Sequence, residues 1–188
     1  MAEDALNDLR NQVLSCRRCE DLVCNRKNIV FGEGDPRARI MFVGEAPGRD
    51  EDIAGRPFVG AAGKLLTQLL KEIVGLEREQ VFIANILKCR PKDNRDPRPD
   101  EIENCKEYVA AQIAIIHPRV ICLLGRHSLE TLISPTMKIS KVHGTPVRWK
   151  GMLYMPVYHP AAALYKGALL EELKSDFRNL KKLVEEDL

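Results

Sequence analysis

The sequence has no uninterrupted apolar run that approaches the roughly 20 residues needed to cross a bilayer, so we expect no membrane-spanning helix. Its first residues lack the basic start and apolar stretch of a signal peptide, which argues against export. An excess of one charge sign is also missing, since 29 Lys and Arg face 27 Asp and Glu. Any contact with nucleic acid must therefore come from a local patch, and we expect a cytoplasmic protein without a membrane partner.

The chain of 188 residues is too short for two independent cores, but its 45% hydrophobic content is enough for one. We therefore expect residues 1–188 to form a single domain. No segment suggests an obligate interface between subunits, so we expect a monomer.

Four short apolar runs rich in branched residues predict strands at 39–43, 81–87, 120–124 and 152–158. Helical periodicity predicts an N-terminal helix and three further helices, around residues 65–73, 102–116 and 169–184. Strands that alternate with helices favour a three-layer α/β/α sandwich around a mostly parallel, four-stranded sheet. In such sheets ligands bind at the carboxyl ends of the strands.

Three of the four predicted strands have polar residues within them or directly after them. Glu45 and Glu51 belong to an acidic turn after the first run, which could also be a solvated loop. Asn85 lies inside the second run, where its amide needs a partner, either backbone or the edge of a base. His159 follows the fourth run, directly before a proline that favours a helix start. It could cap that helix or donate to developing negative charge.

Two familiar nucleotide motifs are incomplete. The segment GAAGK at 60–64 resembles a phosphate-binding loop, but Phe58 occupies the position of its first glycine and Leu65 that of its Ser or Thr. Gly32 and Gly34 lack the third glycine of a dinucleotide fingerprint. Neither nucleotide-cofactor interpretation holds.

Four of the six cysteines form a possible ligand set. The first two are spaced C-x-x-C and the other two flank a proline- and charge-rich loop: Cys16, Cys19, Cys89 and Cys105. Four thiolates suit zinc or an iron–sulfur cluster, and the residues alone favour zinc, because such zinc sites need no special assembly. Cys122 lies in an apolar strand and is predicted to be core, whereas Cys24 competes as a ligand.

Four segments occur in one order with these cysteines around them: GEAPGRDED, GRPFVGAAGKLL, NILKCRP and HPAAAL. Together they resemble the family-four uracil-DNA glycosylases over residues 16–164. Each segment is modest, but their joint order and spacing are highly specific.

The resemblance implies a uracil-DNA glycosylase-like fold and a monofunctional enzyme. Such an enzyme hydrolyses the N-glycosidic bond of uracil flipped out of single- or double-stranded DNA, which starts base excision repair and releases free uracil. In a prokaryote it would act at the nucleoid. The resemblance also replaces zinc by a structural four-iron four-sulfur cluster on Cys16, Cys19, Cys89 and Cys105.

The resemblance also assigns roles to the site residues. Phe58 would stack on the flipped base, although it could be a core residue, and Asn85 would bind the uracil edge. Backbone N–H groups at Ala46 and nearby would hold the base, and His159 would donate to the departing anion. The carboxylates that orient water or balance the sugar charge would be Glu45 and Glu51.

A cluster on the four cysteines would fix a surface at and after the third cysteine that holds five basic residues suited to phosphate contacts: Lys88, Arg90, Lys92, Arg95 and Arg98. An ordinary basic surface loop is the alternative. The other histidines, His117, His127 and His143, are predicted to be structural.

Two other classes of protein remain open. A redox sensor or electron carrier would use the cysteines, but would not explain GEAPG or HPAAAL. A protein that captures uracil without turnover would keep the pocket. Ala46 stands where the best-known uracil glycosylases have a water-activating aspartate, so general-base catalysis is less certain.

Overall fold

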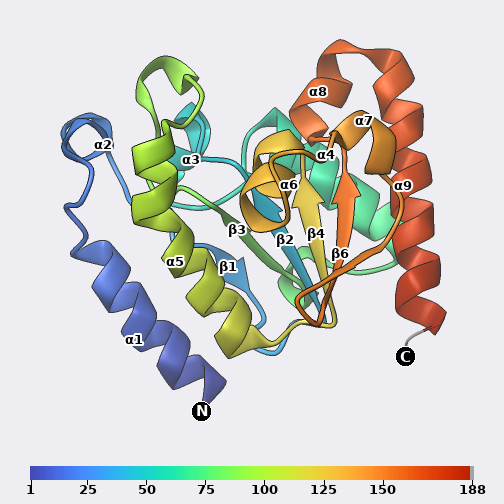
Figure 1. The fold of residues 1–188 in the computed structure, drawn as a ribbon, viewed down its shortest axis with the longest axis horizontal. Helices are drawn as coiled ribbons and strands as arrows, with labels where there is room; N and C mark the ends of the chain where they lie inside the picture. The colour runs from blue at the N-terminus through green and yellow to red at the C-terminus, as the bar shows by residue number, and fades with distance from the viewer. Residues whose placement is uncertain (187–188) are drawn as a thin grey trace.

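A computed structural model describes residues 1–186 as a sheet covered by helices (Figure 1). The six strands have the order β1-β3-β2-β4-β6-β5. The inner four run parallel, and β1 and β5 are antiparallel edges. The strands are β1 (Glu33–Gly34), β2 (Ile40–Gly44), β3 (Phe82–Asn85), β4 (Val120–Leu124), β5 (Val147–Trp149) and β6 (Met152–Val157).

The four predicted strands are the four parallel ones. The prediction of a four-stranded sheet was wrong at the edges, because β1 has two residues and β5 has three, too few for a periodic pattern. The second strand was also predicted three residues too long, one at its start and two at its end. After Asn85 the chain leaves the ladder, and the backbone N–H groups of Ile86 and Leu87 donate to the carbonyls of Gly44 and Glu45.

Helices cover both faces of the sheet. They are α1 (Ala2–Leu14), α2 (Glu20–Asn25), α3 (Arg49–Ala54), α4 (Ala61–Leu69), α5 (Pro99–Ile116), α6 (Arg126–Leu132), α7 (Ile139–Val142), α8 (Pro160–Tyr165) and α9 (Gly167–Glu186). A π-helical turn, Leu70–Val74, continues α4. Within this described part, none of the helices combines the length and apolar composition that a membrane crossing requires.

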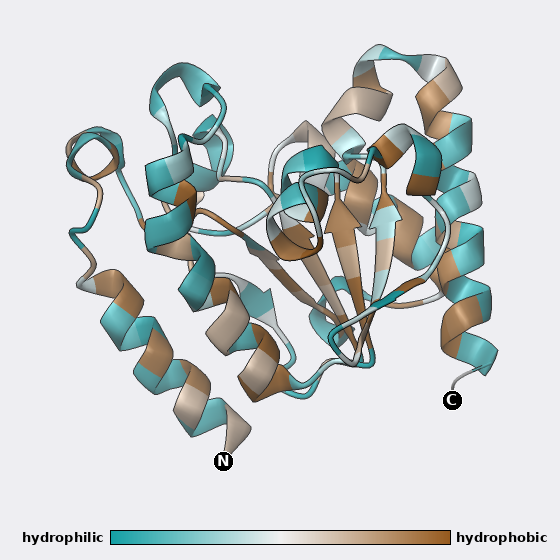
Figure 2. Ribbon diagram, in the orientation of Figure 1, coloured by the Kyte–Doolittle hydropathy of each residue, from teal (hydrophilic) through white to brown (hydrophobic). Residues whose placement is uncertain are grey.

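The strands divide the core into two halves, because neighbouring side chains point to opposite faces. In β2, Met41 and Val43 join the half that contains α1 and α5, whereas Ile40 and Phe42 join the half beneath α4 and α9. Figure 2 shows β3 and β4 mainly in hydrophobic colours and the helices with hydrophilic outer faces. The predicted three-layer α/β/α architecture is confirmed. Cys122 is fully buried in β4, as predicted for a core residue.

The parallel register brings the ends of the inner strands to one edge of the sheet. Gly44, the last residue of β2, pairs with Asn85, the last residue of β3. The neighbouring strands β4 and β6 pair as far as Leu124 and Val157. In Figure 1 their arrowheads point to the end of the molecule where α8 lies. The residues that follow these strands therefore surround one place.

The glycines of the segment GAAGK have a packing function in place of phosphate binding. Gly60 is the N-cap of α4, and Gly63 lies inside the helix. A Cβ atom on Gly63 would overlap the carbonyl group of Phe58. The absence of a side chain at this position lets the Phe58 loop lie directly on α4.

We expect Gly63→Ala to destabilise the protein, although alanine favours a helix, because the new methyl group must displace the Phe58 backbone. Overpacking of this kind costs about 1 to 3 kcal/mol. Urea unfolding measures the change. The matched control is Gly167→Ala in α9, where a Cβ atom would have no neighbour within 4 Å. Equal free energies of unfolding for the two variants would contradict the close contact between Gly63 and the Phe58 backbone.

Candidate functional site

A cavity of about 370 Å³ lies at the carboxyl ends of the inner strands. This volume is within the usual range for small-molecule sites. The structure places every predicted catalytic and base-binding residue in its wall: Glu45, Ala46, Glu51, Phe58, Asn85 and His159. Residues from four different parts of the chain therefore converge on one space.

Glu51 connects two loops of the cavity wall. Its Oε2 accepts a hydrogen bond from the backbone N–H of Gly48 at 3.1 Å. Its Oε1 accepts from the N–H groups of Val59 at 3.0 Å and Gly60 at 2.9 Å. Because both oxygens are engaged by backbone donors, this carboxylate is placed to hold loops in position, which differs from the predicted role of orienting water.

Phe58 presents its ring to the cavity from a constrained backbone. Its φ angle is 49°, a left-handed value that bulky residues rarely adopt. Arg78 holds this conformation by donating to the carbonyl oxygens of Phe58, at 3.0 Å, and of Pro57. The ring centroid lies 5.6 Å from that of His159, with the planes tilted by 31°.

Arg78 is itself held by Glu33. Its Nε donates to Glu33 Oε1 at 2.9 Å, and Arg56 Nε donates to Glu33 Oε2 at 2.7 Å. Burial would raise the pKa of Glu33, but the hydrogen bonds from Arg56 and Arg78 outweigh it and hold the pKa below its usual value. The carboxylate therefore stays charged and fixes the arginine that holds the Phe58 loop.

Asn85 carries an unused hydrogen-bonding group at the cavity. Its side chain is 2% exposed, and its Oδ1 has no hydrogen-bond partner among residues 1–186. A Cβ atom on Gly44 would overlap this oxygen and lie 2.6 Å from the Phe58 ring, so glycine is required beside it. An unpaired buried acceptor costs about 1 to 3 kcal/mol, which a ligand with an N–H donor would recover.

His159 is a neutral hydrogen-bond donor. Its Nδ1 accepts from the backbone N–H of Ala161 at 3.1 Å, which caps α8. Burial lowers the pKa of His159 to about 4. A neutral imidazole that accepts at Nδ1 carries its proton on Nε2. The two interpretations of this histidine are therefore compatible, since one nitrogen caps a helix and the other is left to donate.

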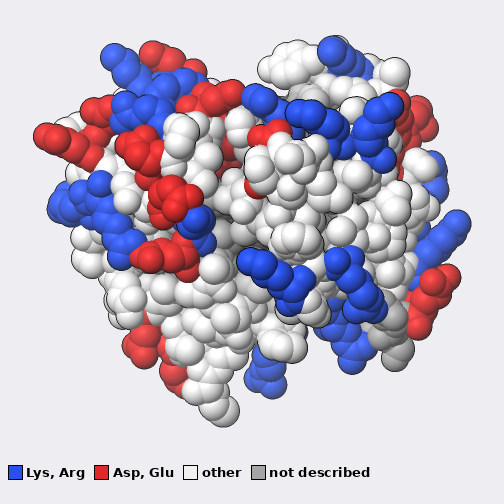
Figure 3. Space-filling model, in the orientation of Figure 1, with Lys and Arg blue, Asp and Glu red and all other residues white. Residues whose placement is uncertain are grey.

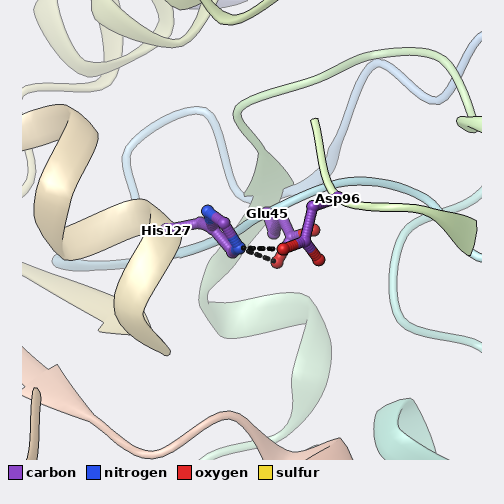
Figure 4. A group of neighbouring side chains, drawn as sticks. All are labelled: Glu45, Asp96 and His127. Atoms are coloured by element: carbon purple, nitrogen blue, oxygen red, sulfur yellow. Dashed lines mark ion pairs between the residues drawn. The ribbon is translucent and has the colours of Figure 1, made fainter. Parts of the chain in front are cut away.

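Glu45 forms part of a group of three side chains that Figure 4 shows pointing toward one another. His127 Nε2 lies 3.5 Å from Glu45 Oε2 and 3.5 Å from Asp96 Oδ2. Burial raises the pKa of Glu45, Asp96 adds to the rise, and His127 opposes it. His127 was predicted to be structural; it does not line the cavity, but it contacts two acids that do. It follows the carboxyl end of β4, and the same position relative to other strands had led us to predict Glu45 and His159 as site residues.

The loop between Cys89 and Cys105 forms a wall of the cavity, which the sequence did not suggest. Its contribution consists of Pro91, Asn94, Arg95 and Asp96. The fully buried Glu101 braces the loop, because it accepts two hydrogen bonds from the Arg95 guanidinium and one, at 2.8 Å, from the Arg98 N–H. Arg98 also pairs with Asp21 at 2.6 Å.

The prediction that the basic residues at and after Cys89 face phosphates was wrong for Lys88, which precedes this loop. Lys88 is 1% exposed, and its Nζ donates inward to the Asn85 carbonyl at 2.8 Å and to Gln112 Oε1 at 2.7 Å. Burial lowers the pKa of this lysine to about 7. Arg95 is bound to Glu101, whereas Lys92 is exposed.

The four predicted ligand cysteines come from three regions. Cys16 and Cys19 lie between α1 and α2, Cys89 follows β3, and Cys105 lies in α5. Cys89 and Cys105 are buried. Burial raises the pKa of Cys105 to about 11, although the backbone N–H of Lys88 lowers it.

Polar groups surround these sulfurs. Arg26 Nη1 donates to Cys89 Sγ at 3.0 Å, and its Nη2 donates to the Cys16 carbonyl at 3.0 Å. Asn104 Nδ2 donates to Cys19 Sγ at 3.5 Å. Donors directed at sulfur favour thiolates, so the surroundings suit metal ligation.

The spacing of the cysteines bears on the metal. Within residues 1–186, the side chains that could bind one ion, with ligand atoms within 4.8 Å of one another, are Glu45, Asp96 and His127, and no trio of cysteines qualifies. One zinc ion with Zn–S bonds of about 2.3 Å holds its four sulfurs ~3.8 Å apart. Among the described residues, no three cysteine sulfurs therefore all lie as close together as the four sulfurs of one zinc site.

Known proteins are similar to this chain in sequence and in fold. Residues 31–184 match the family described as the Uracil DNA glycosylase superfamily. A type-4 uracil-DNA glycosylase of Sulfurisphaera tokodaii is 52% identical, over 96% of this chain and 85% of the relative. A type-4 uracil-DNA glycosylase of Archaeoglobus fulgidus is 47% identical, over 96% of this chain and 94% of the relative.

A solution structure described as a candidate uracil DNA glycosylase of Methanosarcina acetivorans shares the fold, with a TM-score of 0.50 at 14% identity. It covers 82% of this chain and 98% of that chain. The resemblance inferred from the four sequence segments is confirmed by the close relatives. Since the family match and these relatives span most of the sequence, the chain belongs to the uracil DNA glycosylase superfamily and to its type-4 branch.

Proposed function

We propose that this chain, acting as a single-domain monomer, excises uracil from single- or double-stranded DNA and releases the free base. In a prokaryotic cell it would act at the nucleoid, at the first step of repair of deaminated cytosine. The observation that carries the proposal is the unpaired, buried Oδ1 of Asn85 at the cavity. The membership of the type-4 branch supports it independently.

Asn85 would distinguish uracil from cytosine. Uracil presents a ring N–H donor beside a carbonyl acceptor, and an amide offers the complementary acceptor and donor. Cytosine presents an unprotonated ring nitrogen beside an amino group, which would leave Oδ1 facing a lone pair. A site built to pair a particular edge rejects the analogue that leaves its buried polar groups unpaired.

Breakage of the glycosidic bond creates two charges that the site can stabilise. Uracil leaves as an anion. The Nε2–H of neutral His159 would donate a hydrogen bond to the uracil oxygen on which negative charge develops. The sugar becomes positively charged, and Glu45 would balance that charge or orient the water that attacks it. Glu51 would keep both loops in place through its three backbone hydrogen bonds.

A base inside a duplex must first leave the stack. Phe58 would cover the flipped ring, and stacking of this kind contributes about 1 to 3 kcal/mol per base. Leu164 and Tyr165, at the end of α8, are 45% and 88% exposed beyond the cavity. Apolar side chains in such a place can fill the gap that a flipped base leaves in DNA.

The surface charge is uneven although the net charge is small. Figure 3 shows Lys and Arg side chains at the upper centre and right of this face, whereas at the upper left they are mixed with Asp and Glu, and further Lys and Arg lie lower on the face. Three exposed lysines lie in or next to α7 and α8: Lys138, Lys141 and Lys166. Basic side chains around a pocket suit the phosphates on either side of a flipped nucleotide.

A four-iron four-sulfur cluster is the group proposed for the four cysteines, because the chain belongs to the type-4 branch and no three of the described cysteine sulfurs lie as close together as one zinc ion would hold them. Such a cluster would act as a cross-link between the segment before α2, the end of β3 and α5. Cys16, Cys19, Cys89 and Cys105 would hold it, and Arg26 and Asn104 would donate to the ligand sulfurs. Since four residues of the same loop line the cavity, Pro91, Asn94, Arg95 and Asp96, the cysteines would hold a wall of the pocket in place.

Base release from oligonucleotides that contain one uracil tests the proposed function, with thymine and cytosine in its place as controls. We expect an abasic product with uracil alone. Asn85→Ala should lower kcat/KM by on the order of 10²- to 10³-fold, because the pocket loses its contact with the uracil edge. A protein that binds uracil-containing DNA but yields no abasic product would instead be a capture protein.

The charge state of His159 predicts a pH dependence. A histidine with a pKa of about 4 stays neutral across the range in which free imidazole titrates. The ratio of kcat/KM between the wild type and His159→Gln should therefore stay constant from about pH 6 to 8.

His117→Asn serves as the control for this experiment, since His117 is exposed and lies before β4, at the opposite edge of the sheet. It should match the wild type at every pH. A ratio that falls by about tenfold as the pH rises through 6.5 would show that a charged imidazole is the donor.

The metal is tested by replacing cysteines. Cys89→Ser should abolish the visible absorbance of the iron–sulfur cluster and lower the melting temperature, because the cross-link loses a ligand. Cys24→Ser should keep both, since Cys24 is exposed and lies outside the proposed ligand set. Chemical analysis should find about four iron atoms per chain. Zinc in place of iron would contradict the cluster.

A further inference from the structure

His127 occupies a place that the proposed reaction does not yet use. It lies in the first turn of α6, directly after β4, and is 16% exposed. Its Nε2 is equidistant, at 3.5 Å, from carboxylate oxygens of Glu45 and Asp96 (Figure 4). The two acids come from different segments, the loop after β2 and the loop between Cys89 and Cys105.

The surroundings hold this histidine and its partners in place. Asp96 Oδ2 also accepts a hydrogen bond from Arg126 Nη2 at 2.9 Å, so α6 binds the acid through two consecutive residues. Gly125, the N-cap of α6, has a φ angle of +90°, and a Cβ atom there would lie 3.0 Å from the Cβ of His159. The start of α6 is therefore packed directly against the proposed donor.

The charges around Glu45 oppose one another. Burial raises the pKa of its carboxyl, His127 and Arg126 lower it, and Asp96 raises it. His127 also acts on His159, which is neutral near pH 7 because burial lowers its pKa to about 4. Of the two neighbours that lower the pKa of Glu45, His127 is the one with a ring nitrogen 3.5 Å from the carboxylate that would face the sugar.

We propose that His127 is a positioning residue that holds Glu45 at the sugar side of the pocket in its ionised form, while Asp96 competes for the same imidazole. The inference rests on the proposed function, because Glu45 acts there as a carboxylate. It assigns Asp96 a second task, which is to fasten the loop between Cys89 and Cys105 to the rim of the cavity.

Two substitutions should shift the pH profile in opposite directions. Glu45 becomes neutral as the pH falls, so the acid side of the kcat/KM profile follows its protonation. His127→Gln removes a positive neighbour and should move that limb to higher pH by about one unit. Asp96→Asn removes a negative neighbour and should move it to lower pH by a smaller amount. A purely structural role of either residue would give no such pair of opposite shifts.

A readout without catalysis separates this inference from the proposed function. The titration of Glu45 can be followed by NMR of carbon-13-labelled glutamate side chains, with the signal assigned by its loss in Glu45→Gln. We expect the apparent pKa of Glu45 to rise in His127→Gln and fall in Asp96→Asn. These shifts would support the pairing even if no uracil were released by the wild type, an outcome that would count only against the glycosylase function.

His117→Asn is the matched control and should leave both the pH profile and the Glu45 titration unchanged. If His127→Gln does not fold, Asp96→Asn still decides, because the Asp96 side chain is 67% exposed and its replacement leaves the core intact. Shifts in the same direction for the two variants, or an unchanged Glu45 titration in Asp96→Asn, would overturn the proposal.

Discussion

The shape of the pocket depends on the carboxylate of Glu51, which receives three backbone hydrogen bonds from two loops. One loop follows β2 and carries Glu45 and Ala46, and the other carries Phe58. The first loop is also held by the Leu87 N–H, which donates to the Glu45 carbonyl, and the second by Arg78 and by its close packing on Gly63, but Glu51 is the side chain that bonds to both loops. The same two loops meet Asn85, whose amide oxygen fits only because Gly44 has no side chain. An acidic residue in the wall thus supports the geometry that the chemistry requires.

Much of the architecture could be predicted because it depends on local patterns. The runs that became β2, β3, β4 and β6 were recognisable from branched apolar residues, and the stripe in α1 from its spacing. The rule that ligands meet the carboxyl ends of parallel strands then brought Glu45, Asn85 and His159 together, as the cavity does. The short edge strands were missed because their pairing depends on neighbouring strands, which periodicity cannot reveal.

The direction of a charged side chain was the hardest feature to predict. Lys88 looks like a surface cation in a basic loop, yet it turns inward because the end of β3 and α5 supply two oxygen acceptors. His127 was set aside because a lone histidine after an apolar strand is ordinarily structural. Its partners lie 82 residues before it and 31 residues before it in the chain, so only the folded structure shows that they meet. Contacts across such distances leave no local signal.

The clamp on the Phe58 loop bears on the thermodynamics of base capture. Arg78 holds the carbonyls of Pro57 and Phe58, Glu33 holds Arg78, and the phenylalanine keeps a backbone conformation that a free chain would rarely sample. The loss of conformational freedom therefore occurs when the protein folds, before any nucleotide arrives. Because the Phe58 ring is ordered in advance, the free energy of stacking can offset the cost of unpairing the base. A rare lesion can also be tested rapidly, because no loop has to rearrange around it.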